Sequence, residues 1–206
     1  MIEPVVFVVD DDSAIRQSLQ WLIESTGRKV VTFASAQQFL DSVPPVQPGC
    51  LVLDINMPGI TGLELQEQLT AQNLRIPVIV ISGHADVASA VRAMKAGAVE
   101  FLEKPFDDDI LLQRIEQAIA LDARRREEDA KHAKTEERLG RLTPREREIM
   151  ELVVAGHPNK RIAAMLCRSE KTVEIHRANV MQKMEAGSLA ELVREVEVHH
   201  HLKTSR

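Results

Sequence analysis

The chain has 206 residues, of which 44% are hydrophobic and 28% are charged, and its net charge is −5. This length suits two domains, and the composition is that of a soluble globular protein. No stretch approaches the roughly 18 uninterrupted apolar residues that a membrane span needs, and residues 1–9 carry neither a basic leader nor a cleavage site, so we expect a cytoplasmic protein without a membrane segment.

Charge is distributed unevenly along the chain. The net charge is −8 for residues 1–121, zero for residues 122–140 and +3 for residues 141–206. An acidic surface suits a cation site, and a basic module suits nucleic acid. Cys50 and Cys167 lie far apart in the sequence, so neither a structural disulfide nor a metal cluster is expected.

Short apolar, β-branched runs alternate with segments of helical spacing through residues 1–121. The expected strands are 5–9, 29–33, 51–53, 77–81 and 99–102. The expected helices are 13–26, 34–43, 63–71, 87–96 and 108–121. This alternation predicts an α/β domain with a doubly wound, five-stranded parallel sheet.

Residues 122–140 contain mostly charged residues and alanine. Opposite charges stand four residues apart, as in Arg124 with Glu128 and Arg125 with Asp129. Such pairs support an exposed helix, and the segment lacks the apolar stripe of a packed helix, so we expect a helical linker. A coiled-coil dimerisation stalk is the alternative.

From Leu142 onward the pattern is purely helical. Thr143, Pro144 and Glu146 have the spacing of a capping box with proline at the first helical position. Further helices are expected to begin at Asn159, Ser169 and Gly187–Ser188, the last running through Val198. Residues 141–206 are therefore predicted to form an all-α domain of four helices, with a tail from His199 that frays.

Polar residues stand where four of the expected strands end. They are Asp10, Asp11, Asp12, Asp54, Ser82 and Lys104. In an open α/β sheet, ligands bind at this carboxyl edge. Carboxylates that converge there repel one another unless a cation lies among them, and oxygen ligands favour Mg²⁺. We expect Asp11 and Asp54 as direct ligands, the backbone carbonyl of Asn56 as a third, and Asp10 as a ligand through water.

The same edge suits phosphoryl transfer. A carboxylate can attack phosphorus, and Asp54 is the residue available to do so. The transferred group would be stabilised by Mg²⁺, the Lys104 ammonium, the Ser82 hydroxyl and backbone amides near Asn56 and Gly83. The bond between Lys104 and Pro105 is a candidate for a cis peptide.

Each of these residues also has a simpler interpretation. Asp11 or Asp12 could cap the following helix, Asp54 could be a turn residue, and Lys104 could be a solvated lysine. If each simpler role were correct, four unrelated polar roles would fall by chance at the carboxyl ends of four strands, so a common site is favoured.

Four motifs of residues 1–121 resemble those of a CheY-like receiver domain. They are Val9–Asp12, Asp54–Gly59 with Gly62, Ile81–His84 and Lys104–Phe106. The resemblance covers this whole part of the chain and implies a flavodoxin-like fold, with Asp54 phosphorylated by a sensor histidine kinase.

The resemblance also implies a switch formed by Ser82 and Phe101, where the family often has Thr and Tyr. Phosphorylation would draw Ser82 inward and vacate space for the ring of Phe101. By analogy, the face that includes Val91 and Lys95 would then dimerise. The alternative is that Phe101 is only a core aromatic residue.

Residues 159–166 and 169–184 form two expected helices separated by Cys167 and Arg168. This spacing predicts a helix-turn-helix whose second helix enters the major groove. The residues expected to face inward are Val173, Val180 and Met184.

The opposite face of the second helix supplies the expected DNA contacts. Ile175 and Ala178 suit thymine methyl groups, Glu174 can accept from cytosine, and Asn179 also faces outward. The residues expected to hold phosphates are Lys160, Arg161, Lys171, Arg177 and Lys183, with the hydroxyl of Thr172. Any short helical domain carries such charges, so no single contact is specific.

Three motifs of the C-terminal part resemble the LuxR-type four-helix DNA-binding domain. They are Leu142–Glu148, Gly156 with Asn159–Lys160, and Lys171–Met184. Together with the receiver, the chain resembles a two-component response regulator of the FixJ/NarL class. Cys167–Arg168 departs from the family pattern of a small or polar residue followed by an aliphatic one. A buried Arg168 would be costly unless its head reached solvent.

The resemblance implies a phosphorylation-dependent transcription regulator, not an enzyme, that binds promoter DNA as a homodimer and has RNA polymerase as a further partner. A metal-dependent aspartyl phosphatase is one rival, but it would need an acid two residues after Asp54, where Asn56 stands. A second alternative is a phosphorylation-gated adaptor whose output domain binds protein or RNA.

Overall fold

We describe the protein from a computed structural model, in which residues 3–42, 47–83 and 86–204 are described. His84, part of one receiver-like motif, lies outside these ranges. The chain divides into two compact units, Met1–Arg126 and Glu127–Arg206. Within the described ranges, no helix combines the length and the apolar character needed to cross a membrane.

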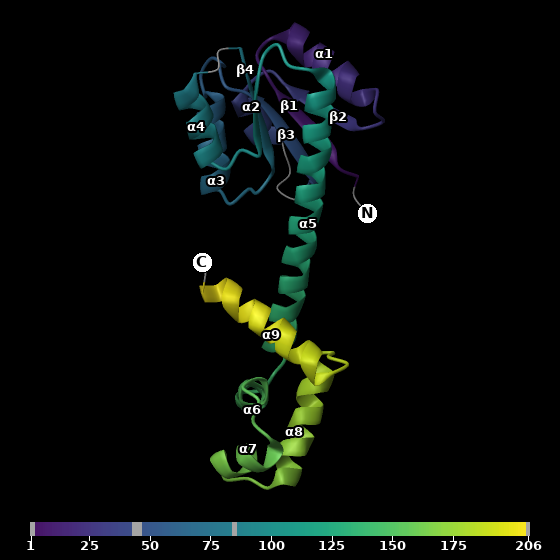
Figure 1. The fold of residues 1–206 in the computed structure, drawn as a ribbon, viewed down its shortest axis with the longest axis vertical. Coiled ribbons are helices and arrows are strands. Elements are labelled where there is room, and N and C mark those ends of the chain that lie inside the picture. The colour runs from purple at the N-terminus through teal and green to yellow at the C-terminus, as the bar shows by residue number, and fades with distance from the viewer. Residues whose placement is uncertain (1–2, 43–46, 84–85, 205–206) are drawn as a thin grey trace. The chain divides into compact units, whose positions relative to one another are not determined.

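The N-terminal unit is built on a parallel sheet in the order β2-β1-β3-β4-β5 (Figure 1). Its strands are β1 (Val5–Val9), β2 (Lys29–Phe33), β3 (Gly49–Asp54), β4 (Val78–Ser82) and β5 (Glu100–Glu103). The order reverses at β1, between β2 and β3, which is the doubly wound arrangement predicted from the sequence.

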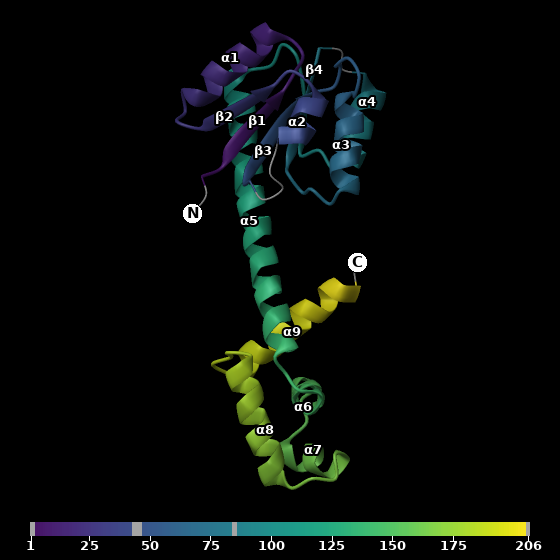
Figure 2. The same cartoon turned by 180° about the vertical axis from the view of Figure 1, so that it is seen from behind.

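Helices cover both faces of this sheet (Figures 1 and 2). They are α1 (Ser13–Glu24), α2 (Ala36–Ser42), α3 (Gly62–Ala71), α4 (Val87–Lys95) and α5 (Asp108–Gly140). Along β1, Phe7 packs in the core beneath α2 and α3, whereas Val6 and Val8 pack against α1 and α5. The strand is buried on both faces, which explains why it is a continuous apolar run.

Local signals set where these helices begin. The side chain of Asp12 accepts the N–H groups of Ala14 and Ile15 and caps α1. Thr61 and Glu64 form a capping box at the start of α3. The interpretation of Asp12 as a helix cap is therefore confirmed.

The helix predicted for residues 108–121 and the helical linker predicted for residues 122–140 form one continuous helix, α5, from Asp108 to Gly140, with no break after residue 121. Its first turn beyond that point packs on the N-terminal unit. Asp122 is buried and accepts hydrogen bonds from the N–H of Gly49 at 2.9 Å and from Arg126 at 2.7 Å. Near the other end, Leu139 is buried in the core of the C-terminal unit. The predicted linker is helical, but its two ends are buried parts of the two units.

The described residues of the C-terminal unit form α6 (Pro144–Val154), α7 (Asn159–Met165), α8 (Glu170–Lys183) and α9 (Leu189–Thr204), as well as the last turns of α5. The prediction that the tail frays from His199 was wrong, since α9 continues to Thr204. His199 is 6% exposed, and its Nε2 lies 3.1 Å from Oε2 of Glu136 on α5. This contact between distant segments adds packing that the tail's own sequence does not reveal.

Candidate functional site

The ends of three strands bring two carboxylates and one ammonium together. Nζ of Lys104, which follows β5, donates to Oδ2 of Asp10 and to Oδ1 of Asp54, at 2.7 Å in each case. Asp10 follows β1, and Asp54 is the last residue of β3. Asp10 is 1% exposed and Asp54 is 4% exposed. The predicted convergence at the carboxyl edge of the sheet is found for these three residues.

Backbone and side-chain donors hold the two carboxylates in place. The N–H of Asn56 donates to Oδ2 of Asp54 at 2.7 Å, and the N–H of Asp12 donates to Oδ1 of Asp10 at 2.9 Å. The amide of Asn56 also reaches Oγ of Ser82 at 3.5 Å. Ser82 is fully buried at the end of β4, so its hydroxyl belongs to the same cluster.

Gly62 allows the loop after β3 to close against the strand. A Cβ atom at this position would lie 2.1 Å from the carbonyl oxygen of Asp54, which no side chain can tolerate. The N–H of Gly62 instead donates to the carbonyl of Ile55 at 3.0 Å. The turn before it uses Gly59 at φ +79°, a conformation that glycine adopts without strain.

The electrostatics of the cluster favour a further cation. Burial raises the pKa of the Asp10 carboxyl, although hydrogen bonds from Lys104 and the Asp12 N–H act in the opposite direction. Burial alone would lower the pKa of Lys104, but its hydrogen bonds to Asp10 and Asp54 outweigh burial and the pKa is raised. Two buried carboxylates therefore share one ammonium, while Nη1 of Arg16 donates to the backbone carbonyl of Asp10 at 2.7 Å, and the hard oxygen donors of the cluster fit Mg²⁺.

Not every expected ligand joins the cluster. Asp11 is exposed, and in the described part of the chain no three His, Cys, Asp or Glu side chains are grouped so as to hold a metal ion. The structure brings two of the three expected carboxylates together, Asp10 and Asp54. The peptide bond between Lys104 and Pro105 is cis, as proposed from the sequence.

The expected switch and dimer residues lie around α4 and β5. Phe101 is half-buried and packs against the core on the side of the sheet that α4 covers. Val91 and Lys95 are exposed on α4. Val87 and Met94 also lie on α4 and are 81% and 47% exposed, but they were not named as part of the expected dimer face. The signal was present, because positions 87, 91 and 94 follow the helical spacing of a single face.

The helix-turn-helix has the predicted geometry. Ser169 caps α8 by accepting the N–H of Thr172 at 3.1 Å. Cys167 adopts a left-handed conformation, with φ +50°, in the turn between α7 and α8. Arg168 is exposed, so its guanidinium is not buried and the energetic cost considered for a buried arginine does not arise.

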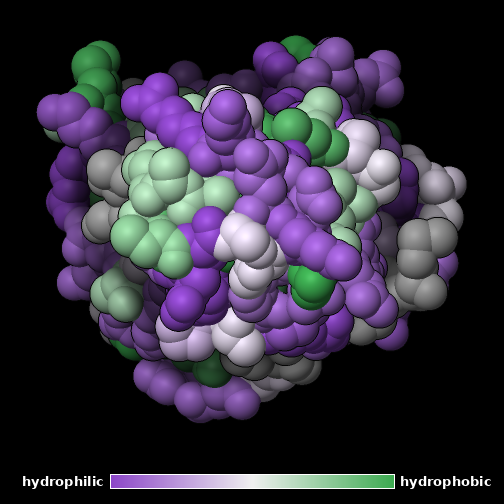
Figure 3. Space-filling model, turned by 90° about the horizontal axis from the view of Figure 1, so that it is seen from below, coloured by the Kyte–Doolittle hydropathy of each residue, from purple (hydrophilic) through white to green (hydrophobic). Residues whose placement is uncertain are grey.

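The two faces of α8 divide as expected. Val173, Val180 and Met184 are buried in the core of the C-terminal unit. The exposed residues of the opposite face are Lys171, Glu174, Ile175 and Ala178, and Thr172 and Asn179 are half-buried. Lys160 and Arg161 on α7 are also exposed. Seen from the end at which α7 lies in Figure 1, the surface is mainly hydrophilic, with hydrophobic residues in small groups (Figure 3).

Two of the expected phosphate contacts are engaged inside the protein. Arg177 donates to Oδ1 of Asn159 on α7 at 2.6 Å. Nζ of Lys183 lies 2.6 Å from Oε2 of Glu146 on α6. Neither partner was predicted, because Asn159 lies 18 positions from Arg177 and Glu146 lies 37 positions from Lys183 in the chain.

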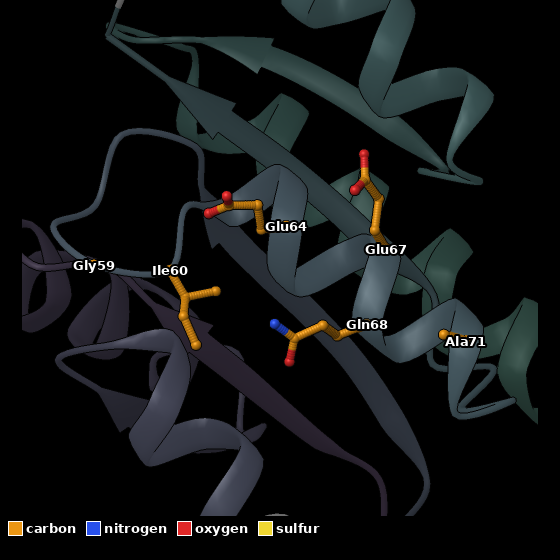
Figure 4. Close-up of a pocket in the computed structure, with 6 residues that line it drawn as sticks. All are labelled: Gly59, Ile60, Glu64, Glu67, Gln68 and Ala71. Atoms are coloured by element: carbon orange, nitrogen blue, oxygen red, sulfur yellow. The ribbon is translucent and has the colours of Figure 1, made fainter.

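An open pocket on the outer side of α3 does not form part of the acidic cluster. It is lined by Gly59, Ile60, Glu64, Glu67, Gln68 and Ala71 (Figure 4). Ile60 and Gln68 point toward one another across it. Glu64 belongs to the α3 capping box, and Glu67 pairs with Arg92 at 3.2 Å, so both acids already have structural roles.

Comparison with known proteins agrees with both halves of this description. Residues 6–116 match the response regulator receiver domain, and residues 140–196 match the luxR family of bacterial regulatory proteins. The chain is 47% identical, over 92% of each sequence, to the transcriptional regulatory protein FixJ of Bradyrhizobium diazoefficiens.

Two solved structures of response regulators match nearly the whole chain. The response regulator StyR superimposes with a TM-score of 0.87 at 49% identity, covering 95% of this chain and 98% of StyR. Full-length FixJ from B. japonicum gives a TM-score of 0.60 at 44% identity, covering 98% of this chain and 99% of FixJ. The paired domains imply a kinase partner and DNA binding. The chain thus belongs to the FixJ/NarL class of two-component response regulators, and it is a phosphorylation-dependent transcription regulator with a LuxR-type DNA-binding domain.

Proposed function

We propose that Asp54 accepts the phosphoryl group and that the receiver, residues 1–121, catalyses this transfer itself. The observation that carries the proposal is the position of Lys104, whose ammonium lies 2.7 Å from carboxylate oxygens of both Asp10 and Asp54. An ammonium at this place can neutralise charge on a phosphoryl oxygen, as phosphoryl transfer requires. Residues 122–140 would link the receiver to the DNA-binding domain, residues 141–206.

The reaction needs few groups. An oxygen of Asp54 would attack phosphorus and form a new O–P bond, while the bond to the leaving group, the imidazole of a sensor histidine kinase, breaks and its electron pair departs with the imidazole. Lys104 and the hydroxyl of Ser82 would then bind two of the phosphoryl oxygens. Water would later hydrolyse the acyl phosphate and restore the carboxylate.

The cation for this chemistry would be Mg²⁺, held by Asp54, the backbone carbonyl of Asn56 and Asp11, whose exposed side chain would have to turn toward the cluster, with Asp10 binding through water. Bound there, Mg²⁺ would neutralise negative charge as the carboxylate approaches the phosphoryl group. The excess of buried carboxylate over ammonium supports this assignment.

The output would follow from repacking on one face of the receiver. If Ser82 moves toward the phosphoryl group, Phe101 gains the space to turn inward. A face made of Val87, Val91, Met94 and Lys95 would then pair with its copy in a second chain. Its three exposed apolar residues are an unusual grouping for a solvated helix, which supports a dimer contact.

The dimer would present two copies of α8 to promoter DNA. Glu174, Ile175, Ala178 and Asn179 would face base edges in the major groove. The backbone phosphates would be contacted by Lys160, Arg161, Lys171 and Thr172. Binding at a promoter would place the protein in the bacterial cytoplasm and beside RNA polymerase, its further partner.

The test combines phosphorylation with DNA selection. The full chain and an Asp54→Asn variant are incubated with Mg²⁺ and a small acyl phosphate, and each is used to select duplexes from a random pool. We expect the unaltered chain to gain a hydroxylamine-sensitive phosphoryl group, to dimerise and to select a two-fold symmetric site. Labelling of the variant, or equal selection by both with and without donor, would overturn the proposal.

A further inference from the structure

A single ion pair fastens the C-terminal end of α8 to the start of α6. Nζ of Lys183 lies 2.6 Å from Oε2 of Glu146, whose side chain is 5% exposed. The same oxygen accepts the N–H of Thr143 at 2.8 Å and its hydroxyl at 2.9 Å. Three donors thus converge on one buried oxygen, which fixes its position relative to both helices.

In this arrangement the Lys183 ammonium is paired with Glu146 inside the domain. The hydrogen bonds from Lys183 and Thr143 lower the pKa of Glu146 to about 2, so the carboxylate is charged near neutral pH. If Lys183, whose side chain is 35% exposed, turned away to a DNA phosphate, it would leave the buried Glu146 carboxylate with only its two Thr143 donors, and the loss of the cation is unfavourable. Lys160 and Lys171, by contrast, are exposed and able to meet a phosphate.

We propose that Lys183 is a positioning residue, which through Glu146 sets how α8 presents its reading face and does not itself neutralise a DNA phosphate. The buried residues Val173 and Val180 hold one side of α8, and directional polar contacts add a restraint on rotation about the helix axis that apolar contacts do not supply. Arg177, bonded to Asn159 on α7 at 2.6 Å, and Lys183, bonded to α6, attach the helix to two different partners. Two polar attachments in different directions restrict that rotation.

The proposal rests on the proposed role of α8 as the reading helix, and it makes a distinctive claim about salt. Each phosphate that a cation neutralises contributes about 0.9 to the slope of log affinity against log salt concentration. A positioning residue contributes nothing to this slope. Its loss instead reduces the preference for the correct sequence, because contacts to base edges depend on geometry.

The experiment uses the phosphorylated full chain, the duplex that this chain selects from a random pool, and a shuffled duplex of the same composition. Affinities for both are measured over a salt series for Lys183→Met, Glu146→Gln and the double variant. We expect each single variant to lower the preference for the selected duplex by about tenfold with an unchanged slope, and the double variant to lose no more than one single variant. Lys183→Arg should keep the preference, because its guanidinium still pairs with Glu146. The matched control, Lys171→Met, should lower the slope by about 0.9.

Three outcomes would overturn the proposal. A fall of about 0.9 in the slope of Lys183→Met, with equal losses on both duplexes, would make Lys183 a phosphate contact. A lower melting temperature with unchanged binding by the folded fraction would make the pair merely structural. If Glu146→Gln kept the full preference for the selected duplex over the shuffled duplex, Glu146 would have no role in sequence recognition. If Lys183→Met does not fold, Glu146→Gln and Lys183→Arg still test the proposal. Failure of the underlying role of α8 is visible separately, because then neither Lys171→Met nor Ile175→Ala would alter binding.

Discussion

The ammonium of Lys104 lies 2.7 Å from Oδ1 of Asp54 and stands between that carboxylate and the carboxylate of Asp10. The side chain of Lys104 is 17% exposed, and those of both acids are nearly inaccessible. The lysine therefore balances charge inside the domain before any phosphoryl group arrives. The same ammonium is the group that we propose to bind the phosphoryl oxygen.

Replacing this lysine should expose the charge imbalance. When Lys104→Met is measured in EDTA, so that no metal is bound, we expect the free energy of unfolding to fall by about 2 kcal/mol or more, because two buried carboxylates lose the cation between them. Added Mg²⁺ should restore part of the loss. Urea unfolding in EDTA and in Mg²⁺ measures both effects, and Lys29→Met, at an exposed position, should change stability by less than about 0.5 kcal/mol. Equal stability of Lys104→Met and the unaltered chain in EDTA would contradict this account.

The close approach at Gly62 gives a second prediction. In Gly62→Ala, the new methyl group would lie 2.1 Å from the carbonyl oxygen of Asp54, so the loop must move away from β3. We expect a loss of about 2 kcal/mol or more in unfolding free energy and slower phosphorylation, since Asp54 directly precedes this loop and Asn56 lies in it. Gly140→Ala is the matched control, because its methyl group meets nothing within 4 Å. Equal denaturation midpoints for the two variants would contradict this prediction, because they would show that the loop can move away from β3 without loss of stability.

The residues that could be predicted from the sequence are those whose role depends on their own strand or helix. Asp10 and Lys104 directly follow strands and Asp54 ends one, and parallel strands must deliver such residues to one edge. Ser169 and the pair of Thr143 and Glu146 are caps that short spacing reveals, and each is found at the predicted helix start.

The features that were missed depend on partners far away in the chain. Asp122 was expected to be one of many exposed charges in the linker, yet its side chain is buried and accepts a hydrogen bond from the N–H of Gly49, 73 positions away. The pairing of Lys183, expected as a phosphate contact, with Glu146 was not predicted, because Glu146 lies 37 positions away. A charge pattern predicts a helix, but it does not say which of its turns packs against another element.

The turn of the helix-turn-helix gives a third prediction. Cys167 has φ +50°, a left-handed conformation that costs a residue with a Cβ atom roughly 1 kcal/mol and costs glycine little. We expect Cys167→Gly to raise the unfolding free energy of the C-terminal unit by about 0.5–1 kcal/mol, part of the gain being offset by the greater freedom of glycine in the unfolded chain. Cys167→Ser is the control, since serine keeps the Cβ atom and should gain nothing. Thermal unfolding of the two variants compares them directly, and a gain in both would assign the effect to loss of the thiol.

The final prediction concerns acid. The pKa of Glu146 is lowered from 4.5 in the unfolded chain to about 2 in the folded protein, first by the hydrogen bond from Lys183 and then by those from Thr143. A lowered folded pKa stabilises the fold fully above about pH 4.5, and this contribution is lost as the pH falls toward about 2. In Glu146→Gln the stability of the C-terminal unit should therefore fall less steeply between these pH values than in the unaltered chain. The control is Glu64→Gln in the capping box of α3, where the carboxylate is exposed and the pKa is lowered mainly by Thr61, so the pH dependence should change less. Urea midpoints at a series of pH values measure the slopes, and parallel curves for Glu146→Gln and the unaltered chain would mean that the pair with Lys183 does not stabilise the fold.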